Sequence, residues 1–458
     1  EGFYLDNVTN AQTDASGNGN NFTNTNTVTL STHTPTNVNA LINPLDTELG
    51  GLVPTNGNLK VTGNTGAVRG FGCTLGANTG KWFFSATKGT SSGSVYLVMG
   101  MVNDDYNIQL TATAPANGWV VNDVQGSYLR AGKDGVTVQI TSSYPTSDHF
   151  VCAVDIDEGE IWFGTSQSGT ITWLPATNGG SVGDPAAGTY PTATFTANIN
   201  LRPFVKMAPG ISTTVNFGNG GFAMTPPTGF DNALNTTNIA ANTSRTASDV
   251  TKYFETTLYE GNGDGQRVGN FQPFGNAFTV GNGALFIEAN SEYLSRTPGA
   301  TGVEEIGTFS GWVKKTKLAV NQYVFSAYVS STNYFQIYFN TSDSLLCSNY
   351  SSGYDWTLNT TQVFEDTSQW VHIVLAVDTT QGVAANRAKL YINGVQVTAF
   401  DTETYPSLNF VNDFNTSSVP NLIGSWDTTP SYEFDGYMSE VVWIDGTQYA
   451  ASDFGQTD

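Results

Sequence analysis

Two β-strand patterns near the end of the chain constrain its fold most strongly. Residues 370–380 and 389–397 form two apolar, β-branched runs that follow one another across a polar loop. The second run contains Asn393-Gly394, a dipeptide that readily adopts the positive φ angles of a tight hairpin turn. This pattern predicts an antiparallel β-sheet in this part of the chain.

The same rhythm of short strands and turns extends over the whole chain. Alternating segments are bounded by Gly, Asn, Pro or Asp, and sustained helical periodicity is nearly absent. The chain has 458 residues, of which 39% are hydrophobic, so two domains with separate cores are expected. We therefore predict an all-β protein with two β-sandwich domains of the jelly-roll type in series.

A polar stretch over residues 233–262 is the best candidate for a linker between these domains. It lacks an apolar run of strand length until Tyr253-Phe254 and ends in a glycine-rich segment. The predicted domains are therefore residues 1–232 and residues 263–458.

Charge and cysteine content exclude several classes of function. Acidic residues outnumber basic ones by 39 to 17, giving a net charge of −22, so nucleic acid is a poor partner. We find no apolar run long enough to span a membrane and no signal peptide. Cys73, Cys152 and Cys347 stand singly, which favours buried free thiols and folding in a reducing cytoplasm.

Motifs in both halves resemble known sandwich families. The segments 80–85 and 151–163, the latter with an acidic turn at Asp157 and Gly159, resemble SPRY domains. The segments 308–315 and 434–446, together with the strand patterns of residues 370–397, resemble laminin-G/pentraxin-like domains. This second resemblance implies a concanavalin A-like jelly roll.

The pairing of these two units resembles virion proteins of tailed phages, particularly marine ones. It implies a non-enzymatic structural protein of the virion, made in the host cytoplasm. The expected role is a tail fibre or receptor-binding appendage that adheres to a host-surface glycan or receptor. Other virion proteins are expected partners, and a homo-oligomer, a trimer, is expected because repeated weak sites raise avidity.

The order of the units is inverted relative to that resemblance. A Gly-Phe-Tyr-Leu-Asp segment, which follows the laminin-G-like unit in such proteins, here stands at residues 2–6. We therefore expect the chain to be a piece of a longer or repeating polypeptide, with a native two-domain protein as the alternative.

Two other functions stay open: a capsid-decorating structural protein and a secreted glycan-processing enzyme. Enzymatic candidates would be the carboxylates of residues 155–160, the Glu304-Glu305 pair, or one of the three histidines, His33, His149 and His372. The first carboxylates flank a turn and no Gly-x-Ser-x-Gly elbow is present, so we expect no enzyme activity.

Aromatic side chains beside small polar residues are the best candidates for a glycan site. Sugars place their C–H face against aromatic rings and their hydroxyls against polar groups at the rim. The candidates are Tyr350, Tyr354, Trp356 and Trp426 in the second half and Trp119 in the first. The alternative for Trp356 and Trp119 is packing in the core of a sandwich.

Metal binding has weaker support. Laminin-G and pentraxin relatives often hold Ca²⁺, and Asp413, Asp427, Asp435 and Asp445 lie on predicted loops or turns. No DxDxDG-type run is present, so solvated turn aspartates are favoured and no cofactor is expected.

Overall fold

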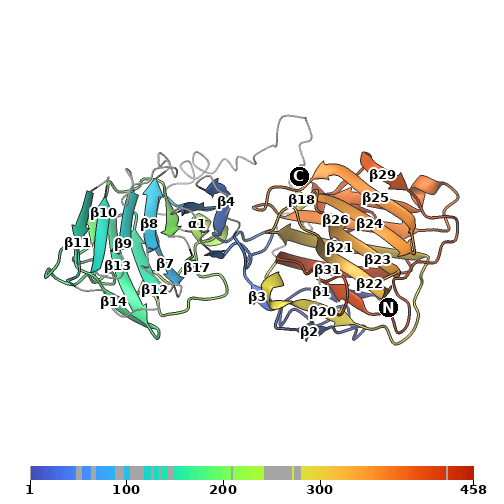
Figure 1. Ribbon diagram of the computed structural model, residues 1–458, viewed down its shortest axis with the longest axis horizontal. Coiled ribbons are helices and arrows are strands. Elements are labelled where there is room, and N and C mark those ends of the chain that lie inside the picture. Colours follow the sequence, from blue (N-terminus) through green and yellow to red (C-terminus); the bar gives the residue numbers. More distant parts are fainter. Residues whose placement is uncertain are drawn as a thin grey trace. The chain divides into compact units, whose positions relative to one another are not determined.

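The protein divides into two compact units, each described here by itself (Figure 1). Unit 1 combines residues 1–36 with residues 258–458, and unit 2 comprises residues 37–257. The computed structural model describes residues 2–47, 54–62, 69–87, 97–103, 118–124, 128–133, 136–142, 149–207, 210–241, 271–272, 280–429 and 432–457.

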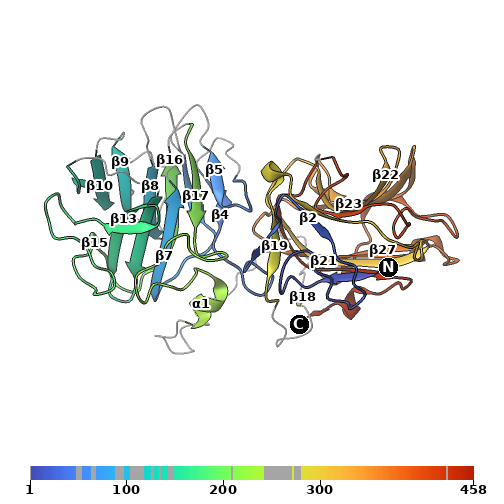
Figure 2. The same cartoon turned by 90° about the horizontal axis from the view of Figure 1, so that it is seen from below.

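Unit 1 is a sandwich of two 8-stranded antiparallel sheets, seen as two layers in Figure 2. The first sheet has the order β28-β27-β26-β21-β31-β19-β3, with β1 also paired to β31. Its strands are β1 (Phe3–Leu5), β3 (Thr29–Ser31), β19 (Gly283–Phe286), β21 (Ile306–Lys315), β26 (Val371–Asp378), β27 (Ala388–Ile392), β28 (Val395–Gln396) and β31 (Gly436–Asp445).

The second sheet of unit 1 has the order β2-β20-β30-β22-β23-β24-β25-β29. Its strands are β2 (Thr23–Thr25), β20 (Tyr293–Arg296), β22 (Gln322–Ser330), β23 (Asn333–Phe339), β24 (Ser344–Ser351), β25 (Tyr354–Val363), β29 (Phe400–Thr404) and β30 (Asn421–Ile423). The predicted turn is confirmed, since Asn393 and Gly394 have φ angles of 47° and 82° between β27 and β28.

The first 36 residues belong to unit 1, so the predicted domain of residues 1–232 is wrong at its start. Strand β1 pairs with β31, β2 with β20 and β3 with β19. The side chains of Phe3 and Leu5 are 1% and 2% exposed and lie in the core of unit 1. Unit 2 is thus an insertion in the sequence of unit 1.

Unit 2 is a sandwich of two 7-stranded sheets, with the orders β11-β10-β9-β8-β16-β6-β4 and β14-β13-β12-β7-β17-β5, and β15 paired to β13. The first comprises β4 (Ile42–Thr47), β6 (Arg69–Cys73), β8 (Leu97–Asn103), β9 (Gly118–Val124), β10 (Tyr128–Lys133), β11 (Val136–Gln139) and β16 (Leu201–Met207). The second comprises β5 (Lys60–Thr62), β7 (Lys81–Thr87), β12 (His149–Asp155), β13 (Glu160–Gln167), β14 (Thr170–Trp173), β15 (Ala193–Thr194) and β17 (Ser212–Asn216).

The core of unit 2 lies between these sheets, and Cys73 and Cys152 are part of it. All three cysteines are buried free thiols, as predicted. The predicted reversal after β12 is also confirmed, because Asp155 pairs with Glu160 and Gly159 has a φ of 71°.

Helix is scarce in the described residues, which confirms the all-β class with two sandwiches. The helical elements are α1 (Thr236–Ala241) and the 3₁₀ turns η1 (Glu288–Asn290), η2 (Ala384–Asn386) and η3 (Ala451–Asp453). A small ladder joins β18 (Phe271–Gln272) to β32 (Gln456–Thr457).

Helix α1 falls within the predicted linker, whose residues 242–262 lie outside the described part. No helix in the described residues is long and apolar enough to cross a membrane.

Candidate functional site

Aromatic rings gather on the outer face of the second sheet of unit 1. Each ring contacts at least one other ring of the group, and we call the group the aromatic face. Its members are Tyr323, Tyr328, Tyr334, Tyr338, Tyr350, Tyr354, Trp426 and Tyr432.

The alternation of side chains along β23 explains why tyrosines reach this face. Successive side chains of a strand point to opposite sides of the sheet. Phe335 and Ile337 lie in the core of unit 1 with no exposed surface, while Tyr334 and Tyr338 project from the other side. In the segment 333–339, tyrosines therefore alternate with core residues every second position. This alternation is visible in the sequence, but our site prediction missed it.

Trp426 lies at the centre of the ring contacts. It belongs to the loop between β30 and β31, and its ring centroid is 5.4 Å from that of Tyr328, 5.5 Å from Tyr334 and 6.0 Å from Tyr432. The hydroxyl of Ser326 on β22 donates to the Trp426 carbonyl oxygen at 2.9 Å. This bond holds the loop against the outer face of the sheet.

The aromatic face has a buried base and an exposed rim. Tyr323 and Tyr338 stack at 4.6 Å and are only 6% and 8% exposed. Tyr354 and Tyr432 are 55% and 52% exposed. The rim is therefore open to a ligand from solvent.

A row of polar side chains crosses the same face between the tyrosines. The strand registers place Ser326 opposite Gln336, Gln336 opposite Ser348, and Ser348 opposite Thr357. Gln336 Nε2 donates to Ser348 Oγ at 2.9 Å. Among the described residues, the buried atoms Gln336 Oε1, Thr357 Oγ1 and Trp426 Nε1 have no hydrogen-bond partner. Unpaired buried polar atoms are uncommon in proteins, and these three can form hydrogen bonds with water or a ligand.

The hydroxyls of Tyr323, Tyr334 and Tyr338 stay protonated at neutral pH. Burial, and then the neighbouring Tyr354 and Tyr350, raises the pKa of Tyr334 to about 12. Burial and nearby tyrosines also raise the pKa of Tyr323 and of Tyr338. Each hydroxyl can therefore both donate and accept a hydrogen bond.

The structure brings three of the five predicted site residues together: Tyr350, Tyr354 and Trp426. The ring of Tyr350 lies 5.3 Å from that of Tyr354, and both belong to the aromatic face with Trp426. Their role in ligand binding stays a prediction.

Trp356 is fully buried in the core of unit 1, so the prediction that it contacts a ligand is wrong. Its indole nitrogen donates to Asn412 Oδ1 at 2.9 Å. Tyr350 pairs with Tyr354 while Asn349 pairs with Trp356, which leaves one extra residue, Asp355, in β25. This bulge shifts the alternation by one, so Trp356 points inward although it follows Tyr354 by two positions.

Trp119 is buried as well, and its predicted role in ligand binding is wrong. It is 5% exposed, lies in the core of unit 2 and packs against Phe195 at 5.1 Å. Its indole nitrogen donates to the Thr194 carbonyl oxygen at 3.2 Å. The side chain therefore stabilises the sandwich.

The acidic residues around the β12–β13 turn have structural partners. Asp155 forms an ion pair with Lys81 at 2.9 Å and accepts the Glu158 N–H at 3.2 Å. Asp157 accepts the Thr79 hydroxyl at 2.5 Å and the Gly80 N–H at 3.1 Å. The bonds to Lys81, Thr79 and Gly80 fix the hairpin to the start of β7.

His372 lies beside Ser310, but both side chains are only 2% exposed. Ser310 Oγ is 3.0 Å from His372 Nε2. Burial lowers the pKa of His372 to about 3, so the ring is neutral. The pair lacks access for a substrate.

The four aspartates considered for calcium each accept a hydrogen bond from a protein donor: the Asn349 amide for Asp413, the Thr429 N–H for Asp427, the Thr316 hydroxyl for Asp435 and the Val303 N–H for Asp445. Within the described ranges, no three Asp, Glu, His or Cys side chains are grouped to hold a metal.

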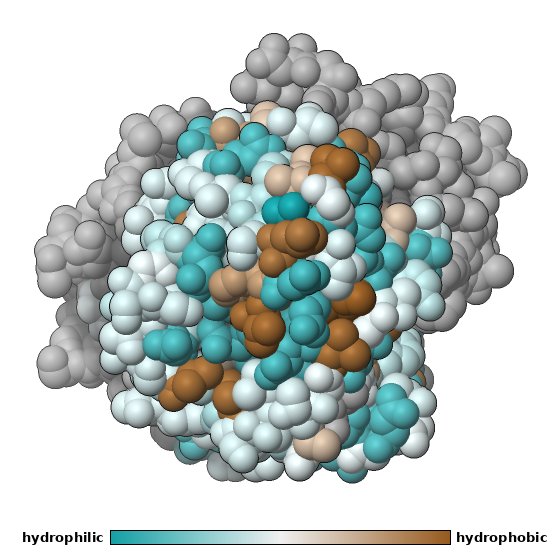
Figure 3. Space-filling view, turned by 90° about the vertical axis from the view of Figure 1, so that its right-hand side faces the viewer, coloured by the Kyte–Doolittle hydropathy of each residue, from teal (hydrophilic) through white to brown (hydrophobic). Residues whose placement is uncertain are grey.

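One side of unit 1 shows a mixture of polar and apolar residues. On the side shown in Figure 3, hydrophobic residues lie in small groups separated by hydrophilic ones. Such a surface offers apolar spots and hydrogen-bonding groups side by side.

Comparison with curated protein sequences gives no match. Among solved structures, the TRIM65 PSpry domain is similar over 39% of this chain and 91% of its own, at 14% identity and a TM-score of 0.29. Domain 4 of the arabinanase AbnA from Geobacillus stearothermophilus, in complex with arabinotriose, covers 41% of this chain and 80% of its own, at 18% identity and a TM-score of 0.30. The Ruminococcus gnavus sialidase module CBM40, bound to α2,3-sialyllactose, covers 35% and 95%, at 16% identity and a TM-score of 0.27.

A family model matches part of unit 1. The match spans residues 289–448, which include strands β20 to β31 and every member of the aromatic face. The model describes the concanavalin A-like lectin/glucanases superfamily. Residues 289–448, with two antiparallel sheets packed around one core, are thus a concanavalin A-like domain.

Proposed function

We propose that this protein binds glycans without modifying them and that the aromatic face is its binding surface. The observation that carries the proposal is the pair of half-exposed tyrosines, Tyr354 and Tyr432, beside buried polar atoms without partners. A sugar would place its C–H face on the rings and its hydroxyls against the rim and the polar row. The matched superfamily, which is named for lectins as well as glucanases, supports this choice.

The proposed biological setting is the virion of a tailed phage. In it, the protein serves as a tail fibre or receptor-binding appendage and adheres to a host-surface glycan, alongside other virion proteins. The pairing of an SPRY-like with a laminin-G-like unit supports this setting. A capsid-decorating role is the alternative within the same particle, and labelling of intact virions with antibodies against this chain would separate the two by position.

The absence of catalysis is also part of the proposal. The carboxylates of the β12–β13 turn are used in the hairpin, and the Ser310–His372 pair is buried. A glycan-processing enzyme would turn over a polysaccharide and would lose that activity on a single carboxylate substitution. Such turnover would replace the binding proposal.

The decisive experiment is a glycan array probed with the intact protein and three variants. Tyr354→Ala removes an exposed ring of the aromatic face, whereas Tyr354→Phe keeps the ring and removes the hydroxyl. Tyr190→Ala is the matched control, because Tyr190 is also exposed, at 60%, but lies in unit 2.

We expect wild type and Tyr190→Ala to bind the same glycans. Tyr354→Ala should weaken binding by about fivefold, since an aromatic stacking contact contributes on the order of 1 kcal/mol. Tyr354→Phe should lie between these results. Equal binding by Tyr354→Ala and wild type would exclude the aromatic face as the binding surface. If no glycan on a broad array is bound, the capsid-decorating role is favoured.

A further inference from the structure

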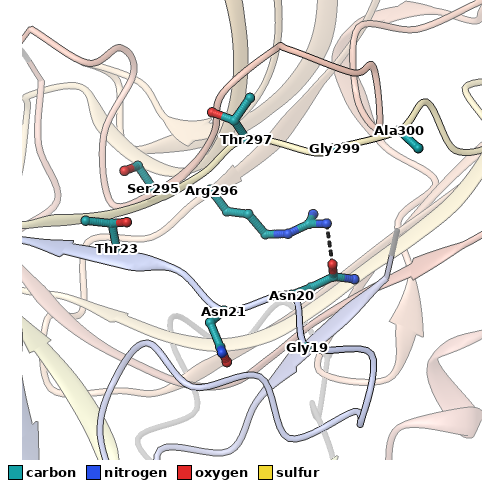
Figure 4. Close-up of a pocket in the computed structure, with 9 residues that line it drawn as sticks. All are labelled: Gly19, Asn20, Asn21, Thr23, Ser295, Arg296, Thr297, Gly299 and Ala300. Atoms are coloured by element: carbon teal, nitrogen blue, oxygen red, sulfur yellow. Dashed lines mark hydrogen bonds between the residues drawn. The ribbon is translucent and has the colours of Figure 1, made fainter.

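Buried cations of unit 1 have partners of different kinds. In the pocket between the loop after β1 and the end of β20 (Figure 4), the Arg296 guanidinium donates to the neutral amide oxygen of Asn20 and has further interactions within the protein. Lys315, the last residue of β21, instead forms an ion pair with the carboxylate of Asp343. The side chains of this pair are only 4% and 8% exposed. An amine nitrogen and a carboxyl carbon are thus held together away from water.

The surroundings of the Lys315–Asp343 pair are apolar. Lys315 Nζ lies 5.1 Å from the centre of the Phe339 ring, and Phe364 packs against that ring edge-to-face at 5.3 Å. Both rings belong to the core of unit 1. Burial lowers the pKa of Lys315, although Asp343 and Glu365 oppose this effect. Because burial disfavours both charged forms, the pair can exchange a proton and become an amine and a carboxylic acid.

Backbone hydrogen bonds hold the Asp343 carboxyl group in place. Asp343 lies in the turn between β23 and β24, where its N–H donates to the Asn340 carbonyl oxygen at 2.9 Å and its own carbonyl oxygen accepts the Phe364 N–H at 2.8 Å. The Ala319 N–H donates to both carboxyl oxygens, at 3.0 Å each. The φ angle of Ala319 is 57°, a left-handed conformation that is strained for alanine. A strained residue therefore directs a hydrogen-bond donor at the carboxyl group.

These groups together suit the formation of an amide between two side chains. A lysine amine in an apolar pocket is a nucleophile. A backbone N–H on the carboxyl group stabilises the negative charge that develops on oxygen when the amine attacks. Since the fold keeps the two groups in contact, the reaction is a step within one molecule and avoids the entropy cost of a collision. We propose that Lys315 and Asp343 join in an isopeptide bond after unit 1 has folded.

The reaction is a condensation that needs no other reactant. The ammonium group of Lys315 first gives a proton to the Asp343 carboxylate. Lys315 Nζ then attacks Asp343 Cγ, so that the Nζ–Cγ bond forms and one Cγ–O bond breaks. The oxygen leaves as water with two of the three ammonium protons, and the third stays on the amide nitrogen. The amide is favoured because the core no longer holds two charges.

The isopeptide bond links the two sheets of unit 1. Strand β21 belongs to the first sheet, whereas Asp343 connects β23 to β24 in the second. A covalent link between the sheets restricts the unfolded chain, as other cross-links do. The bond forms whether or not the aromatic face binds a glycan.

Mass spectrometry of the intact protein tests the proposal. The wild type should be lighter than its sequence requires by the mass of one water molecule. After denaturation and digestion with trypsin, the segment 315–317 should remain joined to the segment 318–387, because trypsin does not cleave after an acylated lysine. Fragmentation of this joined peptide should place the link between Lys315 and Asp343.

Two variants serve as test and control. Lys315→Arg keeps the positive charge but cannot form the amide, since a guanidinium stays protonated. It should have its full mass and give no joined peptide. Lys317→Arg is the matched control, because Lys317 also forms an ion pair, with Glu288, but both side chains are more exposed. It should lose one water as the wild type does, and thermal melts show whether each variant folds.

The wild-type protein alone decides the outcome if Lys315→Arg fails to fold. A joined peptide that contains Lys315 and Asp343 would establish the bond. A wild type of full mass that gives the separate peptides 316–317 and 318–387 would overturn the proposal. A loss of water that maps to other residues, such as a cyclised aspartate, would overturn it as well.

Discussion

Asp355 determines which aromatic side chains of β25 reach the surface. As the extra residue of a bulge, it allows Tyr354 to face outward and Trp356 to face the core. Two neighbouring aromatic residues therefore have opposite roles, one in stability and one in the proposed binding. Mutations at these two positions should separate the roles.

Trp356→Ala should destabilise unit 1 by about 3–5 kcal/mol, because it leaves a large cavity in a packed core. Tyr354→Ala should change stability by less than about 0.5 kcal/mol, since an exposed ring contributes little. Thermal melts of the two variants measure the difference. Similar melting temperatures for both would contradict the opposite placement of the rings.

Lys314 gives a prediction about pH. It lies on β21, is 1% exposed, and its Nζ is 2.9 Å from His33 Nε2. Burial lowers the pKa of Lys314 to about 7, despite the opposing effect of Asp366. An unfolded lysine titrates near pH 10.4, so the unfolded state binds more protons between about pH 7 and pH 10. The free energy of unfolding should therefore rise with pH, by up to about 1.4 kcal/mol per pH unit.

The matched variant for this experiment is Lys314→Met, which keeps an apolar side chain of similar length. Urea denaturation across the window should show a weaker rise for the variant than for wild type. His33 does not interfere, because burial and Lys314 lower its pKa below 6.5. An identical pH dependence in both proteins would mean that Lys314 is charged in the folded state.

At the scale of elements, the N-terminal strands are as much a part of unit 1 as its central ones. Phe3 contacts Phe22 edge-to-face at 4.8 Å within the core. Phe3→Ala should cost about 3–5 kcal/mol of the stability of unit 1 and leave unit 2 unchanged.

Hydrogen exchange distinguishes the two units in this experiment. Amides of β31, which pairs with β1, should lose protection in Phe3→Ala, while amides of β12 in unit 2 should keep it. Val8→Ala is the control, because Val8 is close in sequence but 62% exposed. Loss of protection in β12 instead would place the first strand with unit 2.

Local patterns predicted local elements well. The β26–β27–β28 segment follows from its apolar runs and from Asn393-Gly394, and the β12–β13 hairpin from Asp157 and Gly159. The partners of β1 could not be predicted, because short alternating segments fit any sheet edge and β31 lies at the other end of the chain. The predicted start of the first domain was wrong for this reason.

The candidate site was predictable only in part. Tyr350, Tyr354 and Trp426 stand beside small polar residues, which indicated exposure. The bulge at Asp355 has no signature in the sequence, so Trp356 could not be separated from Tyr354. The polar row became visible only through the pairing of four strands.

At the scale of the whole molecule, each unit has its own core, and the net charge of −22 opposes association with nucleic acid. The proposed trimer would multiply weak glycan sites, and linked sites gain avidity without new contacts. Light scattering should give about three times the mass of 48.9 kDa for this chain. A monomeric mass would contradict the trimer.

The insertion of unit 2 between two parts of unit 1 sets an order for biosynthesis. On the ribosome, the strands β1 to β3 emerge first, yet β31 is translated only after about 400 further residues, on the order of tens of seconds at ordinary elongation rates. During this time the side chains of Phe3, Leu5 and Phe22 lack the later strands of unit 1 against which they pack. Unit 2 can complete its folding in the meantime, so nascent chains should depend on chaperones that shield the unpaired strands β1 to β3.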